Sequence, residues 1–301
     1  MPGDIKMAAQ QDSTLRRIES LVRRRSETDR RMGYGWMIVP LLPLAAAISI
    51  GGIFAELLVS IIPKIANLSQ TNATQTAVEP IVGGLLALYG LGIIVAFGVV
   101  FIGALSFYYL IDRRNLHFGR QQILFSTIHQ YLASKATTSQ NISQLGYLSE
   151  DCASAEVPRP AGLWALLFLF AFPIVGIIAA YGLTQDLRKH DELQSKYQLA
   201  LGASLVEAGI QEPNLPAYKS HNRDPVLFII LTAITGGLFW VYWYYTLLKD
   251  YNEHFTDQAK FEDQVLNIVI PPPTQRTCGS CGGAIPPTAR FCPHCGSQQA
   301  N

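Results

Sequence analysis

The chain has 301 residues, of which 15% are charged and 49% are hydrophobic, whereas soluble domains carry about 25% charged residues. Its 23 basic and 22 acidic side chains nearly cancel, so the net charge gives no indication of nucleic-acid binding. The apolar content excludes a disordered chain, and five cysteines in so long a chain exclude a disulfide-stapled secreted fold. A membrane protein remains.

The basic segment 1–35 opens the chain. Residues 13–31 have the pattern of an amphipathic helix that Ser13 can cap. Its apolar stripe consists of Leu15, Ile18 and Val22. Because arginines cover the other face, we expect this helix to lie on the anionic cytoplasmic surface of a membrane, or else to form a solvated, partly ordered tail.

Four long apolar runs follow, at residues 36–62, 81–111, 161–184 and 225–248. Each is longer than the roughly 20 residues that a helix needs to cross about 30 Å of hydrocarbon. Because lipid offers no hydrogen-bond partners, each segment must satisfy its own backbone groups and is predicted to be helical. The sequence thus predicts an all-α, multi-pass domain over residues 36–268 with four transmembrane helices.

Basic residues indicate the orientation of these spans. Seven arginines precede the first run, whereas the segment 63–80 has one basic residue, Lys64. The positive-inside rule therefore predicts a multi-pass protein of the cell membrane with both termini in the cytoplasm. The segment 185–224 disagrees with this orientation, because it should lie outside and yet carries five basic residues.

A motif of the form N-x-H-F-x-x-Q occurs twice, at residues 115–121 and 252–258. A tyrosine lies seven residues before each asparagine, and the two copies follow the ends of the second and fourth apolar runs. This placement favours the parallel duplication of a two-helix unit, with both halves starting in the cytoplasm.

The histidines of this motif, His117 and His254, are candidates for binding a metal or haem group, provided that they face each other. The alternative is that the Asn, His and Gln side chains of each copy hydrogen-bond to neighbouring elements. We expect the second of these roles.

One ionisable residue, Glu56, lies within the four apolar runs. Moving ions or polar solutes requires such groups at membrane depth, so Glu56 is the candidate functional acid of a transporter or channel. Its position near the outer end of the first run favours contact with the outer membrane interface instead.

The fourth apolar run resembles part of an uncharacterised prokaryotic membrane family, a domain of unknown function. Members of that family carry Thr-x-Gly-[Ile/Leu]-[Tyr/Phe], then Tyr-Trp, then a charged helix that contains Asn. The matching residues are Thr235, Gly237, Leu238, Phe239, Tyr242, Trp243 and Asn252. The resemblance implies a small prokaryotic inner-membrane protein and implies no activity.

A proline-rich linker over residues 269–277 separates these runs from a cysteine-rich tail. The tail has two Cys-x2-Cys pairs, made by Cys278, Cys281, Cys292 and Cys295. Four thiolates suit a tetrahedral zinc ion, with two disulfides or an iron site as alternatives. A glycine after each pair permits a sharp turn there.

The run 278–296 closely resembles the short prokaryotic zinc-ribbon family. The resemblance implies a zinc ribbon over residues 278–301 in which these four cysteines bind one Zn²⁺ ion. We expect Ile285 and Phe291 to form its small core. Because four protein ligands leave no position open for water, the predicted ion is structural and not catalytic.

The sequence shows no catalytic triad order, phosphate-binding loop or dinucleotide fingerprint, so we expect no enzyme. Arg276 and Arg290 supply too little charge for nucleic acid to be the tail's partner. The expected function is that of an integral membrane subunit or adaptor, whose tail docks other membrane or cytoplasmic proteins. The alternative is a component of a transporter or channel for small solutes or ions, with an unknown substrate.

Overall fold

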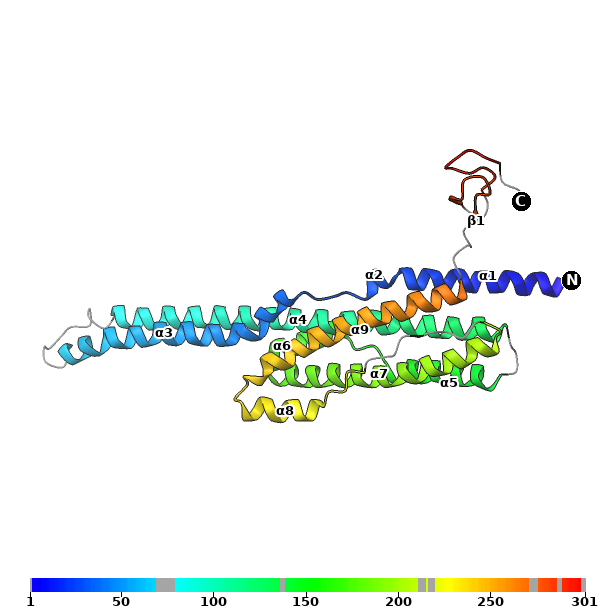
Figure 1. Cartoon of the computed structure of the whole chain (residues 1–301). Coiled ribbons are helices and arrows are strands. Elements are labelled where there is room, and N and C mark those ends of the chain that lie inside the picture. Colours follow the sequence, from blue (N-terminus) through cyan, green and yellow to red (C-terminus); the bar gives the residue numbers. More distant parts are fainter. Residues whose placement is uncertain are drawn as a thin grey trace.

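A computed structural model describes residues 2–68, 79–135, 139–210, 215, 220–270, 276–285 and 289–298. Apart from a short β-ribbon in the tail, the elements in these ranges are helices. Figure 1 shows an elongated molecule in which two long helices project from one end of a helical bundle. The predicted all-α class is therefore confirmed for the part of the chain that the structure describes.

The N-terminal segment forms α1 (Pro2–Arg23) and the short α2 (Arg25–Thr28), so this segment is helical. The predicted cap is wrong, because Ser13 lies inside α1 and its hydroxyl donates to the Gln10 carbonyl at 2.7 Å. Its apolar stripe, however, packs against protein. Ile18 and Val22 are 0% and 4% exposed within a core to which α4, α7 and α9 contribute. The bundle therefore covers the apolar face of this helix, and contact of its arginine-rich face with a membrane surface stays a prediction.

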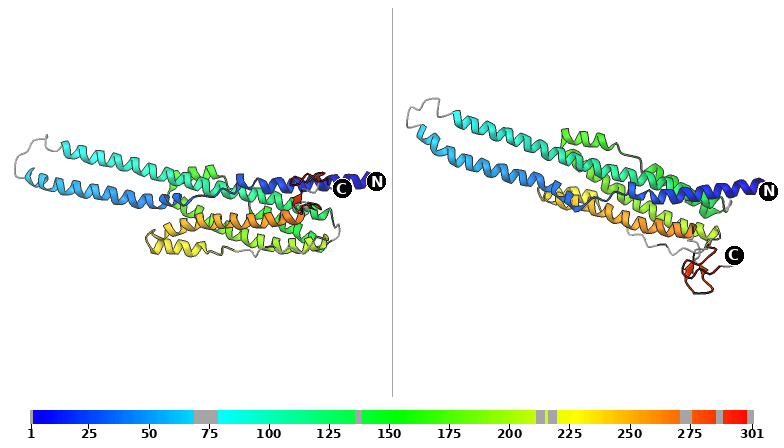
Figure 2. Two further views of the ribbon diagram at one scale, coloured as in Figure 1. Left: turned by 45° about the horizontal axis from the view of Figure 1, so that its top comes forward. Right: turned by 90° about the horizontal axis from the view of Figure 1, so that it is seen from above.

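The first two apolar runs form a long helical hairpin. A 3-10 turn (η1, Tyr34–Met37) leads into α3 (Ile38–Leu68), which is followed by α4 (Glu79–Ala133). The two helices lie side by side in every view of Figures 1 and 2. Both are long and apolar enough to cross a membrane. At 55 residues, α4 spans about 80 Å and continues from the hairpin into the bundle.

The third and fourth apolar runs are each divided by a turn. The third forms α6 (Ala161–Ala171) and the start of α7 (Ile174–Glu207), and the fourth forms α8 (Pro225–Ile234) and the start of α9 (Phe239–Val269). The prediction of four membrane-crossing helices is not confirmed, because the described residues contain two that are long and apolar enough.

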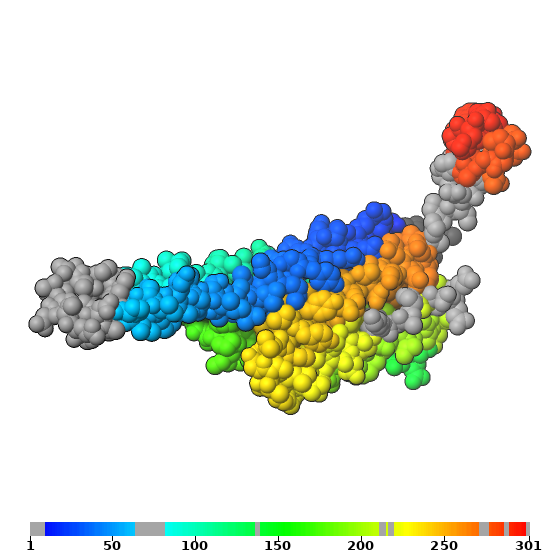
Figure 3. All heavy atoms as spheres, turned by 60° about the vertical axis from the view of Figure 1, so that its left-hand side comes forward, coloured from blue at the N-terminus to red at the C-terminus, as the bar shows by residue number. Residues whose placement is uncertain are grey.

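Ion pairs at the base of each short helix show that the chain folds back on itself. Arg159, just before α6, pairs with Asp186 on α7 at 2.7 Å. Arg223, just before α8, pairs in the same way with Asp250 on α9. Each apolar run therefore returns to the level at which it began, and the two form short hairpins beside α3 and α4. Figure 3 shows the yellow surface of the α8–α9 hairpin next to the blue surface of α3.

The two turns have local causes in the sequence. Pro173 lacks a backbone N–H and so cannot continue the helix that α6 begins. Helix α8 ends in a Schellman motif, in which Gly236 has a φ of +60° and the Gly237 N–H donates to the Thr232 carbonyl at 2.8 Å. The turns after α6 and α8 were not predicted, because the residues on both sides of each turn are apolar.

The bundle contains two apolar cores along the shared axis of α4, α7 and α9. One core, at the level of the short hairpins, includes Phe107, Trp243 and Leu248. The other includes Phe125, Tyr197 and Phe261, and α1 and α5 (Gln140–Ala155) help to cover it. A layer of buried polar side chains lies between the two cores and forms the first of the sites described below.

The tail contains a two-stranded antiparallel ribbon, β1 (Arg276–Thr277) paired with β2 (Ala284–Ile285). The greater part of the predicted proline-rich linker, residues 271–275, lies outside the described residues. The described parts of the tail are 276–285 and 289–298, and these ranges include all four of its cysteines.

Candidate metal centres

The buried polar layer brings together the two histidines of the repeated motif. His117 on α4 and His254 on α9 are separated by 137 residues, yet their Nε2 atoms lie 3.0 Å apart. His190 on α7 completes the group, with ring centroids 4.8 Å from His254 and 5.6 Å from His117. We call His117, His190 and His254 the histidine cluster. Their exposed fractions are 0%, 1% and 1%, respectively.

His190 was not predicted as a site residue, although the sequence contains a signal for it. Helix α7 carries Tyr181, His190 and Gln194, and the spacing Tyr-x8-His-x3-Gln is the same on α4 and α9. The phenylalanine and asparagine of the motif are replaced on α7 by Asp191 and Arg188, which conceals the third copy. The pattern Tyr-x8-His-x3-Gln therefore occurs three times, once each on α4, α7 and α9.

A carboxylate contacts the Nδ1 atom of each ring in the histidine cluster. The partners are Asp29 for His117 at 2.9 Å, Glu156 for His190 at 2.6 Å and Asp191 for His254 at 3.1 Å. Ionised carboxylates only accept hydrogen bonds, so each ring donates its Nδ1 proton. A neutral ring then has a lone pair on Nε2, through which it can bind a metal ion.

Burial keeps two of these rings neutral. It lowers the pKa of His117 to about 3, although the Asp29 carboxylate opposes this effect. Burial likewise lowers the pKa of His254, against the hydrogen bond to Asp191. Burial alone would raise the pKa of Asp29, but its contacts with His117 and Arg120 hold that pKa well below its usual value.

The residue that follows each histidine touches the next ring in a cyclic order. Phe118 stacks on His190 with centroids 4.2 Å apart, and Phe255 lies 4.7 Å from His117. The third position is Asp191, which contacts His254. These contacts give the three helices an approximate threefold arrangement around the cluster.

The two asparagines of the motif hydrogen-bond to neighbouring segments of the chain, as the alternative hypothesis proposed. Asn115 donates to the Arg159 carbonyl at 2.6 Å and accepts from the Arg159 N–H at 3.0 Å. Asn252 brackets the backbone of Met32 in the same way, at 2.8 and 3.2 Å. Each asparagine therefore fixes the chain just before an apolar hairpin, whereas the histidines face each other.

Arg120 and three glutamines extend the polar layer beyond the rings. Arg120 bridges two buried carboxylates, donating to Asp29 at 2.9 Å and to Glu262 at 2.8 Å. Gln194 donates to Gln258, and neither polar atom of the Gln121 side chain has a hydrogen-bond partner among the described residues. Gln121 is 1% exposed, so its unsatisfied amide costs about 1–3 kcal/mol per group.

The second group of candidate metal ligands consists of the four tail cysteines, which we call the cysteine cluster. The Sγ atoms of Cys278 and Cys295 lie 3.6 Å apart, and those of Cys281 and Cys292 lie 3.7 Å apart. Four sulfurs at 2.3 Å around a tetrahedral zinc ion would be about 3.8 Å from one another. The predicted ligands therefore lie close enough together to hold one metal ion.

Each Cys-x2-Cys pair of the cysteine cluster forms the same tight turn. Gly282 donates to the Cys278 carbonyl at 2.8 Å, and Gly296 donates to the Cys292 carbonyl at 2.9 Å. Both glycines have a positive φ, +68° and +73°, which explains why glycine occupies these positions. The Ser280 N–H points at the Cys278 sulfur at 3.4 Å, a contact that stabilises thiolates.

The predicted core of the tail is only half correct. Ile285 is 2% exposed and packs with Cys278 and Cys292, but Phe291 is 61% exposed. Phe291 pairs with Gln298 in a β-bridge, and the next residue, Cys292, points inward. Because neighbouring side chains of an extended segment point to opposite sides, Phe291 is directed outward.

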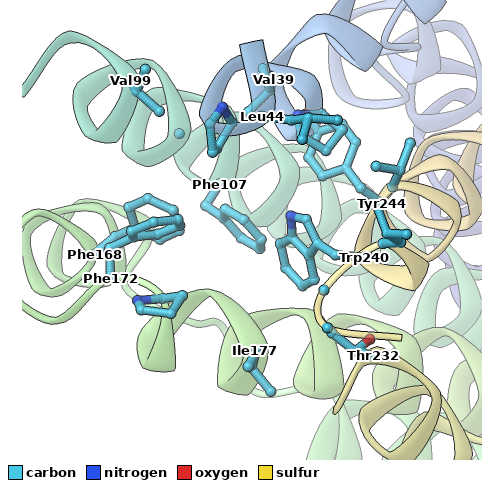
Figure 4. Close-up of a pocket in the computed structure, with 18 of the residues that line it drawn as sticks. Val39, Leu44, Val99, Phe107, Phe168, Phe172, Ile177, Thr232, Trp240 and Tyr244 are labelled. Atoms are coloured by element: carbon cyan, nitrogen blue, oxygen red, sulfur yellow. The ribbon is translucent and has the colours of Figure 1, made fainter. Parts of the chain in front are cut away.

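A cavity of about 510 Å³ lies among the apolar hairpins and is lined in part by the core that contains Phe107 and Trp243. Figure 4 shows its lining of mainly aromatic and aliphatic side chains, which come from α3, α4 and the two short hairpins formed by α6–α7 and α8–α9. Such a lining suits an apolar ligand. Glu56 is exposed on α3 and does not line this cavity.

Comparison of the chain with protein-family models, with curated proteins and with solved structures found no match.

Proposed function

We propose that this chain is a non-enzymatic integral membrane subunit or adaptor, whose zinc-binding tail docks a protein partner. The exposed Phe291 carries the docking part of the proposal. In a module whose core contains Ile285, Cys278 and Cys292, an aromatic side chain that is 61% exposed is not needed for folding. Aromatic residues, phenylalanine included, are enriched in the buried cores of protein interfaces.

In this proposal the α3–α4 hairpin crosses the bilayer and the other two hairpins enter it only part-way. Helices α6 and α8 have 11 and 10 residues and so reach about 15–16 Å, half the hydrocarbon thickness of about 30 Å. Their outward side chains are apolar: Phe170 is 83% exposed and Ile234 is 76% exposed.

The backbone groups of the α8–α9 turn are hydrogen-bonded, which is compatible with a position of this turn within the hydrocarbon of the membrane. The N–H groups of Gly236, Gly237 and Leu238 donate to carbonyls of the preceding turn, and the Phe239 N–H donates to the Thr235 hydroxyl at 2.9 Å. Irregular backbone within lipid is tolerated only when such groups are satisfied or line a cavity. This turn also lines the apolar cavity.

This arrangement accounts for the charge pattern that disagrees with four spans. Because each short hairpin returns to its starting level, the segment 185–224 lies on the same side as the N-terminus, and its five basic residues then obey the positive-inside rule. Both termini remain cytoplasmic, as four spans would also place them. The two arrangements differ in the side of residues 185–224.

Labelling with a membrane-impermeant thiol reagent distinguishes the two arrangements. A cysteine introduced at Lys196 should react from the same side as one introduced at Arg17, in sealed vesicles of known orientation and in a background without the native cysteines. Reaction of the two positions from opposite sides would restore four full spans and contradict the partial hairpins.

Docking is tested by F291A in the full chain, purified in mild detergent with its partners. The variant should lose a stoichiometric partner protein but keep the tail's metal ion. The matched control is S280A, which alters another exposed tail side chain and should retain the partner. A wild-type chain that is consistently isolated without a partner, or F291A binding like S280A, would contradict the docking function.

The alternative of a transporter or channel has Glu56 as its supporting residue. The cavity of about 510 Å³ is lined by apolar groups and not by Glu56, so it offers no polar pathway around that acid. We therefore favour the adaptor.

A further inference from the structure

The histidine cluster differs from an ordinary buried hydrogen-bond network in how its nitrogen atoms are paired. All three Nδ1 atoms contact carboxylates, which fixes the proton on that side of each ring. The Nε2 atoms of His117 and His254 then face each other at 3.0 Å with a lone pair on each. Two lone pairs at this distance repel, and a cation close to both would turn the repulsion into attraction.

The third ring has an unpartnered nitrogen. The Nε2 atom of His190 has no hydrogen-bond partner among the described residues, although the side chain is 1% exposed. One nitrogen from each of the three rings lies within 4.8 Å of one from each of the others. A buried acceptor without a partner is destabilising, so this atom also indicates a missing ligand.

The carboxylates around the rings have the arrangement that metal-binding histidines require. A ligating histidine almost always donates its other ring N–H to a carboxylate or carbonyl, which orients the ring and strengthens it as a ligand. Here all three rings have such a partner, supplied by three separate segments: the residue after α2, the residue after α5, and α7. Three buried carboxylates also favour a positive charge at their centre.

We propose that His117, His190 and His254 bind one divalent transition-metal ion through their Nε2 atoms, at a site separate from the cysteine cluster. Imidazole ligands suit zinc, copper, iron and nickel, which defines the class of ion. The ion ties α4, α7 and α9 together between the two apolar cores. This inference goes beyond the proposed adaptor function, which needs the tail's ion alone.

Another group could bind a cation, and the test must exclude it. His221, Asp250 and Glu253 also have ligand atoms within 4.8 Å of one another. In that group, Asp250 is already paired with Arg223. A substitution at His190 changes the histidine cluster and leaves this second group intact.

The experiment counts metal ions in the full chain, purified without a histidine tag, stripped of metal under reducing conditions and reloaded with Co²⁺. The wild-type protein should bind two equivalents. One should show the intense sulfur-to-cobalt charge-transfer absorption of thiolate ligation, and the other should lack that absorption. Elemental analysis of the same samples gives the number of ions per chain.

The variant H190Q should bind one equivalent, with the thiolate spectrum alone. Its matched control is H129Q, which removes a partly exposed histidine of α4 from outside the cluster and should still bind two. Circular dichroism should show the same helix content for all three proteins. A wild-type chain that binds one equivalent, or a helical H190Q that binds two, would overturn the proposal, and the wild-type count holds even if H190Q fails to fold.

Discussion

The histidine and cysteine clusters are built in opposite ways. The cysteine cluster takes its four ligands from 18 consecutive residues, and Cys281 and Cys295 are exposed. The histidine cluster takes its three ligands from three helices, and all three are buried between extensive apolar cores. A metal ion bound by the tail would therefore supply most of its folding energy, whereas the bundle has its own cores to hold the histidines in place.

Removing bound metal ions should have the largest effect, and it should affect the tail and not the helical bundle. A strong chelator is expected to unfold the tail, because metal binding is worth about 10–16 kcal/mol in comparable small zinc modules. Trypsin should then cleave rapidly after Arg290, while circular dichroism shows that the helices persist. The variant C152S, changed at a buried cysteine outside the tail, should behave like the wild type. Protection of Arg290 in the chelator would contradict a metal-dependent tail.

Breaking the ion pairs of the bundle should have the next largest effect. R120M would leave the Asp29 and Glu262 carboxylates buried without their cation, at a cost of about 3–5 kcal/mol in the free energy of unfolding. The control is R30M, because Arg30 is 57% exposed and its pair with Asp112 is worth less than about 1 kcal/mol. Denaturant titration in detergent measures both. Equal effects of the two substitutions would show that the buried layer contributes no more than the surface.

Replacing the carboxylate that contacts one ring of the histidine cluster should weaken metal binding there and leave metal binding at the cysteine cluster unchanged. E156Q replaces the carboxylate that contacts His190 Nδ1 and should weaken binding at the histidine cluster by about 10–100-fold. Competition titration with Co²⁺ should show unchanged affinity for the thiolate site. E150Q, on the exposed face of α5, the helix that Glu156 follows, is the control and should change neither affinity. Loss of thiolate binding in E156Q would mean that the two clusters are coupled.

The smallest effect is expected from the core next to the cavity. A Cβ atom at Gly103 would lie 2.7 Å from the Phe168 ring, so G103A should destabilise the bundle by about 1–3 kcal/mol without changing the metal content. At Gly98, one and a half turns earlier on α4, a Cβ atom has no neighbour within 4 Å. Thermal unfolding should therefore separate G103A from G98A, and equal melting temperatures would contradict this packing.

Sequence reasoning could predict the cysteine cluster because its information is local. Spacing alone brings Cys278 and Cys281 together, and the glycine after each pair indicates the turn. The orientation of Phe291 could not be read in this way, because it depends on which side of an extended segment faces the sulfurs.

The histidine cluster could not be predicted from the sequence alone, because it depends on how the chain folds. His117 and His254 stood out through the repeated motif, but their contact across 137 residues depends on where the chain turns back. Pro173 and the Gly236–Gly237 pair are the residues that decide this, and the apolar composition around them favoured unbroken spans. The same turns bring His190 to the cluster from a segment that four full spans would place outside.

The most direct test of two separate metal centres is X-ray absorption at the zinc edge of the fully loaded wild-type chain. Zinc bound by thiolates has ligands at about 2.3 Å, and zinc bound by imidazoles has ligands at about 2.0–2.1 Å. The account predicts both shells in the wild type and the loss of the shorter one in H190Q. A wild-type spectrum explained by sulfur ligands alone would contradict it.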